Sequence, residues 1–509
     1  MNGIDFDRFR LRRFLQTLRE AGQLEVQDGP LDLVDIAAVL EGNGMAVLFQ
    51  KVGPEGWDLA GNVAASRQRL ALAFGTTVDG LVPEVQRRLG LVPEIVEVSR
   101  AQAPVQQIVL TGDEADLTTL PVHLQHGLDG GLYISSSTDF TVDPATGRTN
   151  IGMRRLMLRG RRETGIDLVA PSDLRAIYEA CVRLGERLPL SFVVGSHPID
   201  HVASTMRFAG DELELLASLR AAPLPVVKCI TNDVRVPADS EWVIEGYLDE
   251  RGWVEAEGPY GEFLGYYGIV KQNPVFHVTA ITRRHDAVFQ TSTIGGYHLD
   301  CTDTAQLGSL RTEVTLRRAL EVAVREVTAV HATTSSGGSF NVRVALRQRV
   351  PGEARNAIAA VFASLVNVKH VFVVDPDIDV FSDAQMDWAL ATRFQADRDL
   401  VVQSGFRAMP LDPSLVGAAT TAKAGFDLTL PFGSAGQTLD TLVPEPPRFD
   451  SSRFPSVDVA LADGPKTFEA LMAALGSRDG REVVLILEAL RSAGRLTRDR
   501  DGRYMLDRA

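Results

Sequence analysis

The pattern of apolar residues changes twice along this chain of 509 residues, and that change restricts the possible folds most strongly. From Tyr133 to Thr293 the apolar segments are short, β-branched and bounded by turn residues, which is typical of a β-rich domain. The regions on either side mix strand-like and helix-like patterns, as α/β units do. The chain is also longer than one hydrophobic core usually serves. We therefore predict a multidomain α+β protein.

The first region opens with a helix between Phe6 and Leu24, because apolar residues recur there at helical spacing and Gly22 ends the run. A long helix from Thr304 to Val327 separates the β-rich region from the second α/β region. Pro-rich sequence from Val443 to Pro455 has the character of a linker. We place the domains at residues 1–115, 116–303, 304–445 and 446–509.

Individual elements can be placed inside these regions. The expected strands are Ala46–Phe49, Tyr133–Val142, Ser191–Val194, Val226–Ile230, Val275–Ile281, Phe340–Leu346 and His370–Val374, and the expected helices include Ser66–Phe74, Ala354–Ser364 and Asp383–Thr392. The last segment, Thr467–Leu506, shows two helical patterns and a hairpin that turns at Asp501 and Gly502. Helices followed by a hairpin indicate a small winged-helix-like appendage, either for binding a partner or nucleic acid or for packing and oligomerisation.

Charge and cysteine content narrow the possible partners and compartment. The formal net charge of −14, from 66 acidic and 52 basic residues, disfavours binding to nucleic acid or to an anionic membrane surface. The three cysteines are far apart and form no CxxC pair, which suits a reducing environment. No apolar run approaches the length of a membrane span. We expect a cytoplasmic protein.

Two carboxylates five positions apart, Glu257 and Glu262, flank the turn Gly258-Pro259-Tyr260-Gly261. Glycine and proline fix such a turn and allow it to approach a ligand closely. Two carboxylates brought near one another cannot both ionise cheaply, so one is driven towards its protonated form, as general acid catalysis requires. A solvated acidic turn is the alternative interpretation of this segment alone.

Longer stretches resemble the UbiD family of decarboxylases. EGPYGEFLGYYG, beginning at Glu257, is similar to the signature loop of that family, and VVKCITNDVRVPADSEWVIEG, from Val226 to Gly246, precedes it as in the family. TNIGMRR, from Thr149 to Arg155, together with DIDVFSDAQMDWALATR from Asp377 and TTAKAGFDLT from Thr420, also resembles family segments. The resemblance runs from about Phe6 to Thr429 and implies three parts: an N-terminal α/β unit, a central split β-barrel of the flavin-reductase kind and a C-terminal α/β domain.

The resemblance also implies an activity: non-oxidative, reversible decarboxylation of an aromatic or heteroaromatic, α,β-unsaturated acid through a covalent adduct with prenylated flavin mononucleotide. Removing carbon dioxide from an unsaturated carbon leaves electrons that no ordinary side chain can delocalise, so a cofactor must accept them. By resemblance Arg155 pairs with Glu257, and Glu262 gives the proton to the carbon that loses its carboxylate. Indole, pyrrole, phenazine, hydroxybenzoate and cinnamate-type acids are candidate substrates.

Further roles follow from the resemblance alone. The residues expected to bind the flavin are Asn150, Ile151, Met153, Arg155, Ser172, Met206 and Lys423. Those expected at the metal sites are Asn150, Asp173 and Glu212 for Mn²⁺ or Mg²⁺, with Ser204 and Met206 near K⁺ or Na⁺. Asp173 stands where well-known members carry a metal-binding histidine, so metal binding is expected to be altered. Asp173 and Glu212 have a second interpretation as acidic residues that stabilise the start of a helix.

The expected substrate pocket contains Phe263, His298 and Leu307, and the apolar run Leu428–Phe432 is a further candidate for its wall. All of these apolar residues have an equally simple interpretation as core, and the other histidines show no metal-binding spacing. Implied partners are an aromatic carboxylate, a flavin prenyltransferase that supplies the cofactor, and further copies of the chain in a dimer or larger assembly. The competing hypothesis is a catalytically weakened scaffold or regulatory protein that acts through its C-terminal appendage.

Overall fold

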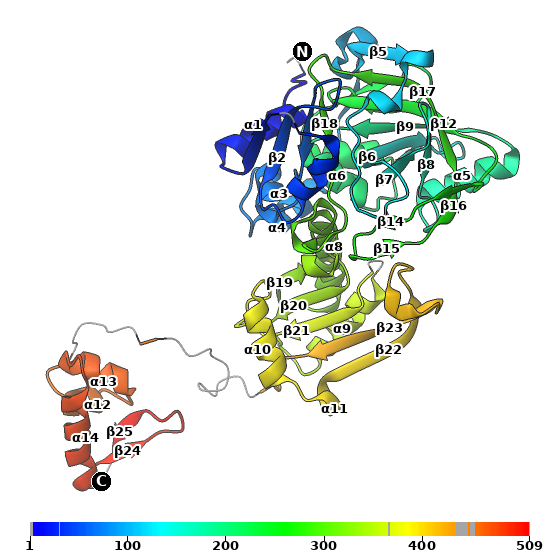
Figure 1. The fold of residues 1–509 in the computed structure, drawn as a ribbon. Coiled ribbons are helices and arrows are strands. Elements are labelled where there is room, and N and C mark those ends of the chain that lie inside the picture. Colours follow the sequence, from blue (N-terminus) through cyan, green and yellow to red (C-terminus); the bar gives the residue numbers. More distant parts are fainter. Residues whose placement is uncertain (1–3, 30, 365–366, 434–445, 448–453, 508–509) are drawn as a thin grey trace.

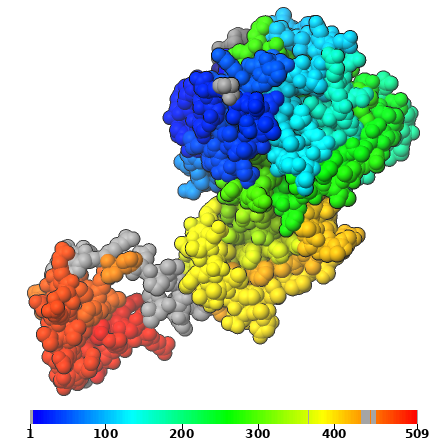
Figure 2. Space-filling view, viewed as in Figure 1, coloured from blue at the N-terminus to red at the C-terminus, as the bar shows by residue number. Residues whose placement is uncertain are grey.

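The computed structural model describes residues 4–29, 31–364, 367–433, 446–447 and 454–507. Figure 1 shows two large parts joined by one long helix, with a small C-terminal part set apart from both. The space-filling view gives the same division, with the yellow C-terminal α/β unit against the blue-to-green part (Figure 2). The fold is therefore α+β and multidomain, as the sequence predicts.

A closed barrel of six antiparallel strands forms the centre. Around the ring the strands are β6 (Tyr133–Val142), β7 (Thr149–Leu158), β8 (Glu163–Ile166), β17 (Val275–Arg283), β12 (Trp242–Leu248) and β9 (Leu188–Val194), and β9 pairs with β6 to close it. Ile134, Leu156, Phe192, Ile244 and Phe276 give this barrel a shared apolar core from five strands. The prediction of a β-barrel is confirmed.

The N-terminal sheet takes strands from two distant regions. It contains β1 (Leu24–Asp28), β2 (Ala46–Val52), β3 (Trp57–Gly61) and β18 (Val288–Gln290). β18 runs parallel to β3 although more than 200 residues separate them, while β5 (Ile108–Thr111) leaves the N-terminal region and pairs with barrel strand β17. The two parts thus exchange strands across the boundary expected near residue 115.

Helices cover this sheet and the barrel. α1 (Leu11–Glu20) buries Leu11, Phe14, Leu15 and Leu18 and is shorter than the expected helix, since residues 6–9 form a turn. α3 (Arg67–Phe74) and α4 (Leu81–Arg88) follow. α6 (Pro198–Thr205) and α7 (Glu212–Arg220) pack against β7, and α5 (Asp173–Leu184) also contacts this strand. The N-termini of α5 and α7 carry two of the expected metal ligands.

α8 (Asp303–Ala323) leads from the barrel to the C-terminal sheet (Figure 1). That sheet has the order β19 (Val327–Ala332), β20 (Asn341–Leu346), β21 (His370–Val374), β23 (Thr420–Asp427), β22 (Leu400–Arg407), with α9 (Glu353–Ala363) and α10 (Asp383–Arg393) between strands. Its core is separate from that of the barrel and includes Leu316, Val344, Ile358 and Val371. The expected helices and strands of this region are confirmed.

The C-terminal part contains three helices and a hairpin: α12 (Val457–Ala462), α13 (Phe468–Leu475), α14 (Arg481–Ser492), β24 (Leu496–Arg498) and β25 (Tyr504–Leu506). Its core cluster comes only from residues 454–506. The sequence showed the last two helices and the hairpin, and α12 is the addition. The linker expected at Val443–Pro455 lies mostly outside the described residues. No helix in the described part of the chain has the length and apolar character needed to cross a bilayer.

Candidate active site

Arg155 on β7 is the centre of a cluster of carboxylates. Its Nε lies 3.1 Å from Glu257 Oε1, and a second guanidinium nitrogen lies 3.0 Å from Glu262 Oε1. The third nitrogen lies 2.9 Å from Asp167 Oδ2, in the segment that follows β8. Lys271 Nζ is 3.2 Å from the same Asp167 oxygen. The structure therefore brings together the three expected catalytic residues. Arg155 precedes Glu257 by 102 positions in the chain, and a turn separates Glu257 from Glu262.

The segment that carries the two glutamates is held from several sides. β13 (Glu255–Glu257) ends at Gly258, whose φ of +95° favours glycine, and a cis Gly258–Pro259 bond leads into β14 (Tyr260–Gly261). The Arg155 guanidinium lies 4.6 Å from the centre of the Tyr260 ring, an arrangement that attracts a cation to the ring face. Gly261 N donates to Asp129 Oδ1 at 2.9 Å. Glu262 is thereby fixed at the end of a short, restrained turn.

The two glutamates differ in their hydrogen bonds. Glu257 is 1% exposed and accepts from Arg155 and from Asn273 Nδ2 at 3.2 Å. Glu262 is 4% exposed, yet its Oε1 has no aligned hydrogen-bond donor among the described residues. Burial raises the pKa of Glu262, and Arg155 and Lys271 oppose that rise without cancelling it. The shift favours the protonated form of Glu262, which a proton donor requires.

A cavity of about 280 Å³ lies against Glu262 and Arg155. Its walls include apolar Met153, Ile294, Phe263 and Leu307, and on the side of the C-terminal domain Asn367 and Met409. A largely apolar pocket with a few convergent polar groups is typical of small-molecule sites. Of the expected substrate-pocket residues, Phe263 and Leu307 line this cavity.

A second polar cluster lies where β7 begins. Glu212, the first residue of α7, accepts from Asn150 Nδ2 at 3.0 Å and from the backbone N–H of Ile151. Burial raises the pKa of Glu212 to about 8, and the negative charges of Asp139 and Asp173 add to the rise. Two of the expected metal ligands, Asn150 and Glu212, are therefore in direct contact.

The remaining expected ligands are less closely assembled. Asp173 is exposed at the first turn of α5, where Ser172 caps the helix by accepting from Arg175 N. Ser204 is buried near the end of α6 and donates to His201 O, and Met206 follows that helix. Within the described residues, no group of three His, Cys, Asp or Glu side chains is placed to hold a metal ion. Ser172 caps the start of α5, which agrees with the interpretation of this segment as a helix start.

Two further expected site residues lie away from the cavity. Lys423 on β23 is buried in the C-terminal domain, where its Nζ donates to Phe362 O at 3.0 Å and burial lowers its pKa. His298 is 60% exposed at its side chain and pairs with Glu41 at 3.0 Å. Neither side chain lines the cavity with Arg155 and Glu262.

Sequence reasoning missed several residues that support the site: Asp167, Lys271, Asn273, Gln125 and Asp129. Gln125 Oε1 accepts from the Tyr260 hydroxyl, and its amide nitrogen donates to Ser135 Oγ at 2.6 Å. No spacing in the sequence marks Asp167 or Asn273 as partners of the triad. His123, Gln125, His126 and Asp129 form a polar group that can be seen in the sequence, but nothing in the sequence shows that it contacts the segment Tyr260–Gly261.

Three family models together match most of the chain between residues 15 and 428. The 3-octaprenyl-4-hydroxybenzoate carboxy-lyase models match in three parts: the N-terminal domain over residues 15–89, the Rift-related domain over 96–298 and the C-terminal domain over 305–428. The chain belongs to the UbiD family of carboxy-lyases, and it is an enzyme of that family by fold and by relatives.

The relatives share about a third of their residues with this chain. An anhydromevalonate phosphate decarboxylase of Methanosarcina mazei is 32% identical over 82% of this chain and 95% of its own length. A phenolic acid decarboxylase of Sedimentibacter hydroxybenzoicus is 30% identical over 86% of this chain and 95% of its own. These two enzymes are named for chemically different acids.

Solved structures show the same fold. The UbiD-class enzyme HmfF from Pelotomaculum thermopropionicum, in complex with FMN, has a TM-score of 0.79 and 32% identity, covering 89% of this chain and 99% of that one. An evolved dimeric form of HmfF in complex with prFMN has a TM-score of 0.75 and 31% identity, covering 83% and 95%. The expected family is thus confirmed.

Proposed function

We propose that this protein decarboxylates an aromatic or α,β-unsaturated carboxylic acid with the help of a prenylated flavin mononucleotide. The observation that carries the proposal is the contact of Arg155 with both Glu257 and Glu262, at 3.1 and 3.0 Å, beside a largely apolar cavity. The names of the relatives and the flavin complexes of HmfF support it.

The residues of the chain supply binding and a proton. Arg155 offers a positive charge to the substrate carboxylate at the cavity wall. When the bond between the unsaturated carbon and its carboxylate breaks, carbon dioxide leaves and the carbon must receive one proton. Protonated Glu262 gives that proton and becomes a carboxylate, which takes a proton from solvent before the next turnover. Glu257 keeps the guanidinium in place through this change.

The cavity fits the chemistry of a flavin. Met153, Phe263 and Leu307 offer apolar contacts to a planar ring, and the unsatisfied Glu262 Oε1 is buried at its edge. When bound, a prenylated flavin supplies an acceptor for the electron pair that decarboxylation leaves behind. Met153 and Arg155 line this cavity and would contact the flavin ring. The other residues that we assign to the flavin by resemblance, Asn150, Ile151, Ser172, Met206 and Lys423, do not line it.

The oxygen donors at Asn150 and Glu212 suit a hard cation such as Mn²⁺ or Mg²⁺. Burial raises the pKa of Glu212, and a cation would offset the charges of Asp139 and Asp173 that add to this rise. Asp173 would complete this set, while Ser204 and Met206 would serve K⁺ or Na⁺. Asp173 is exposed, and among the described residues no hydrogen bond joins it to Asn150 or Glu212.

Two partners belong to the proposal. A flavin prenyltransferase would supply the cofactor, and the chain would act as a dimer or larger homo-oligomer, as the dimeric form of HmfF suggests by analogy. The competing hypothesis is a scaffold or regulatory protein that acts through its C-terminal appendage from Thr467, and it gives the contact of Arg155 with Glu257 and Glu262 no role. We also propose that the reaction is reversible, so that the same site carboxylates the product when carbon dioxide is abundant.

The test is to coexpress the chain with a flavin prenyltransferase, record the absorption spectrum and measure carbon dioxide release from a panel of benzoic, heteroaromatic and cinnamic acids. We expect flavin bands and release from at least one acid. Protein made without the prenyltransferase should be inactive and recover on reconstitution. Turnover without any flavin, or no flavin binding after reconstitution, would refute the proposal and favour the scaffold.

A further inference from the structure

A second cavity, of about 450 Å³, adjoins the one that contains Glu262. The two share Thr205, Arg311 and Asn367 as lining residues, so they lie next to one another between α8, the end of α6 and the C-terminal domain. The reacting groups Arg155 and Glu262 line the first cavity, and of the residues assigned to the flavin only Met206 lines the second.

Four arginines line the second cavity: Arg207, Arg311, Arg318 and Arg407. No acidic residue lines it, although the chain carries a net charge of −14. Among the described residues none of the four guanidinium groups has a carboxylate within ion-pair distance, and Arg311 Nε is buried without a hydrogen-bond partner. Burial lowers the pKa of Arg311, and the charge of Arg207 lowers it further.

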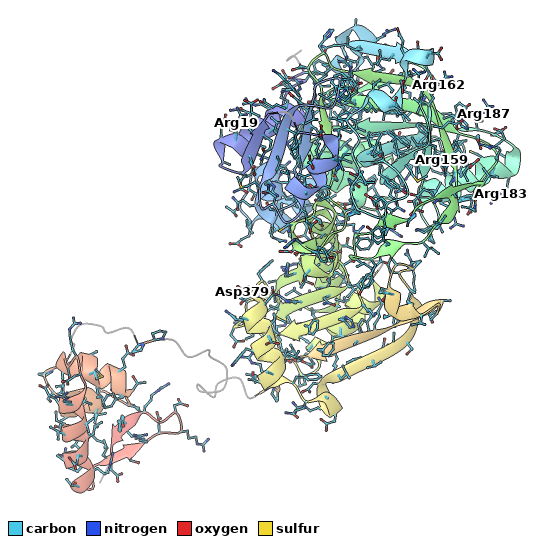
Figure 3. The ribbon with its side chains drawn as sticks, in the orientation of Figure 1. Arg19, Arg159, Arg162, Arg183, Arg187 and Asp379 are labelled. Carbon is cyan, nitrogen blue, oxygen red and sulfur yellow. The ribbon has the colours of Figure 1, made fainter. Side chains whose placement is uncertain are left out.

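Some other arginines of the chain have partners. Arg159, Arg162 and Arg187, labelled in Figure 3, lie on the barrel side of the molecule. Arg159 donates to Ala256 O, Arg162 lies 3.8 Å from Asp113 and Arg187 lies 3.2 Å from Glu250. Arg162 and Arg187 thus face a carboxylate, whereas the four arginines beside α8 gather without one and have the composition of an anion-binding site.

The geometry of α8 connects the two chambers. Leu307, Arg311, Val314 and Arg318 follow one another at intervals of four, three and four residues, so they lie on one face of the helix. At 1.5 Å per residue, the Cα atoms of Leu307 and Arg318 are about 16 Å apart. Leu89, Leu215 and Val314 give the second chamber apolar walls between its charges.

We propose that the substrate carries a second anionic group, a carboxylate or a phosphate, on an apolar body, and that Arg311, Arg318 and Arg407 bind this group while the reacting carboxylate faces Arg155. This inference rests on the proposed decarboxylation and deepens it, because it names the class of acid. A dianionic acid would be preferred over the monoanionic acid with the same ring.

The experiment compares matched acids by isothermal titration calorimetry and by carbon dioxide release, using the flavin-loaded protein. The pairs are benzoate with terephthalate, and cinnamate with its 4-carboxy and 4-phosphonooxy derivatives. The variants are Arg318→Gln and Arg407→Gln. Arg317→Gln is the matched control, since Arg317 is the neighbour of Arg318 but pairs with Glu321 at 2.8 Å outside the cavity.

We expect the wild-type protein to bind a dianion roughly tenfold or more tightly than its monoanionic partner. Arg318→Gln and Arg407→Gln should bring this ratio close to one, and Arg317→Gln should keep it. Equal affinities in the wild type, or an unchanged ratio in both cavity variants, would overturn the inference. So would loss of bound flavin in those variants, because the arginines would then serve the phosphate of the cofactor. A preference for dianions without release of carbon dioxide from any acid would instead contradict the proposed reaction alone.

Discussion

Arg155 and Asp167 form the third ion pair of the site, with 2.9 Å between guanidinium nitrogen and carboxylate oxygen. Arg155 is thus bound on three sides, by Glu257, Glu262 and Asp167. Lys271 balances the added negative charge from the other side of Asp167. The position of the guanidinium therefore depends on a residue that contacts neither glutamate.

Replacing Asp167 with Asn should lower kcat by about ten- to hundredfold, because Arg155 loses one of the contacts that orient it. The negative charge of Asp167 also raises the pKa of Glu262. Its removal should lower that pKa, so the loss of activity on the alkaline side of the kcat/KM profile should begin at a lower pH. The measurement is a pH–rate profile of both proteins.

Asp167→Glu serves as the control, because it keeps the charge and should return the profile towards that of the wild type. A purely structural role would lower activity equally at every pH. An unshifted alkaline limb in Asp167→Asn would therefore remove Asp167 from the positioning of the site.

Glu262→Gln should reduce turnover by about 10² to 10⁴-fold, since an amide cannot give the proton that the product carbon requires. Bound flavin should remain, because Glu262 contributes one of several contacts around the cavity. Stopped turnover with an unchanged absorption spectrum is the expected pair of results. Wild-type rates in this variant would assign the proton to another group.

Much of the fold could be predicted because its signals are local. β6 begins at Tyr133 and ends at Val142, as the β-branched run indicated, and α10 matches its prediction within one residue. Strand β18 could not be assigned to the N-terminal sheet, since three residues carry no information about a partner more than 200 positions away. Pairing of that kind is decided by tertiary packing.

The site was predictable only where residues resemble a family motif. Arg155, Glu257 and Glu262 meet as expected, yet Asp167 gave no signal, because nothing in its spacing reveals that β8 places it beside Arg155. The arginines of α8 were missed for a similar reason. In sequence they resemble the charged positions of a solvated helix, and only the neighbouring C-terminal domain turns that face into a cavity wall.

Arg220→Ala should lower the free energy of unfolding by about 3–5 kcal/mol, because it leaves two buried carboxylates without their cation. Arg220 is 1% exposed and lies 2.6 Å from Asp200 and 2.7 Å from Asp239. Arg187→Ala is the control: its pair with Glu250 is exposed, so the expected change is about 0–1 kcal/mol. Denaturant unfolding of both variants gives the comparison, and equal losses would contradict the role of burial.

The last prediction concerns acid sensitivity. His201 on α6 is 1% exposed, both of its ring nitrogens lack a hydrogen-bond partner among the described residues, and burial lowers its pKa to about 4. Below pH 6.5 the unfolded chain binds a proton at this residue while the folded chain does not, so stability is lost as the pH falls from 6.5 towards 4.

Replacing His201 with Leu removes this loss. The free energy of unfolding of the variant minus that of the wild type should therefore be about 2 kcal/mol larger at pH 5 than at pH 7.5. His285→Gln, on an exposed loop, should keep the wild-type dependence on pH. The measurement is the free energy of unfolding in denaturant at several pH values between 4.5 and 7.5 for the three proteins. Parallel curves for the wild type and His201→Leu would show that the acid sensitivity arises elsewhere. His123 and His197 would then be the next residues to replace, because burial lowers their pKa values to about 4 and about 3.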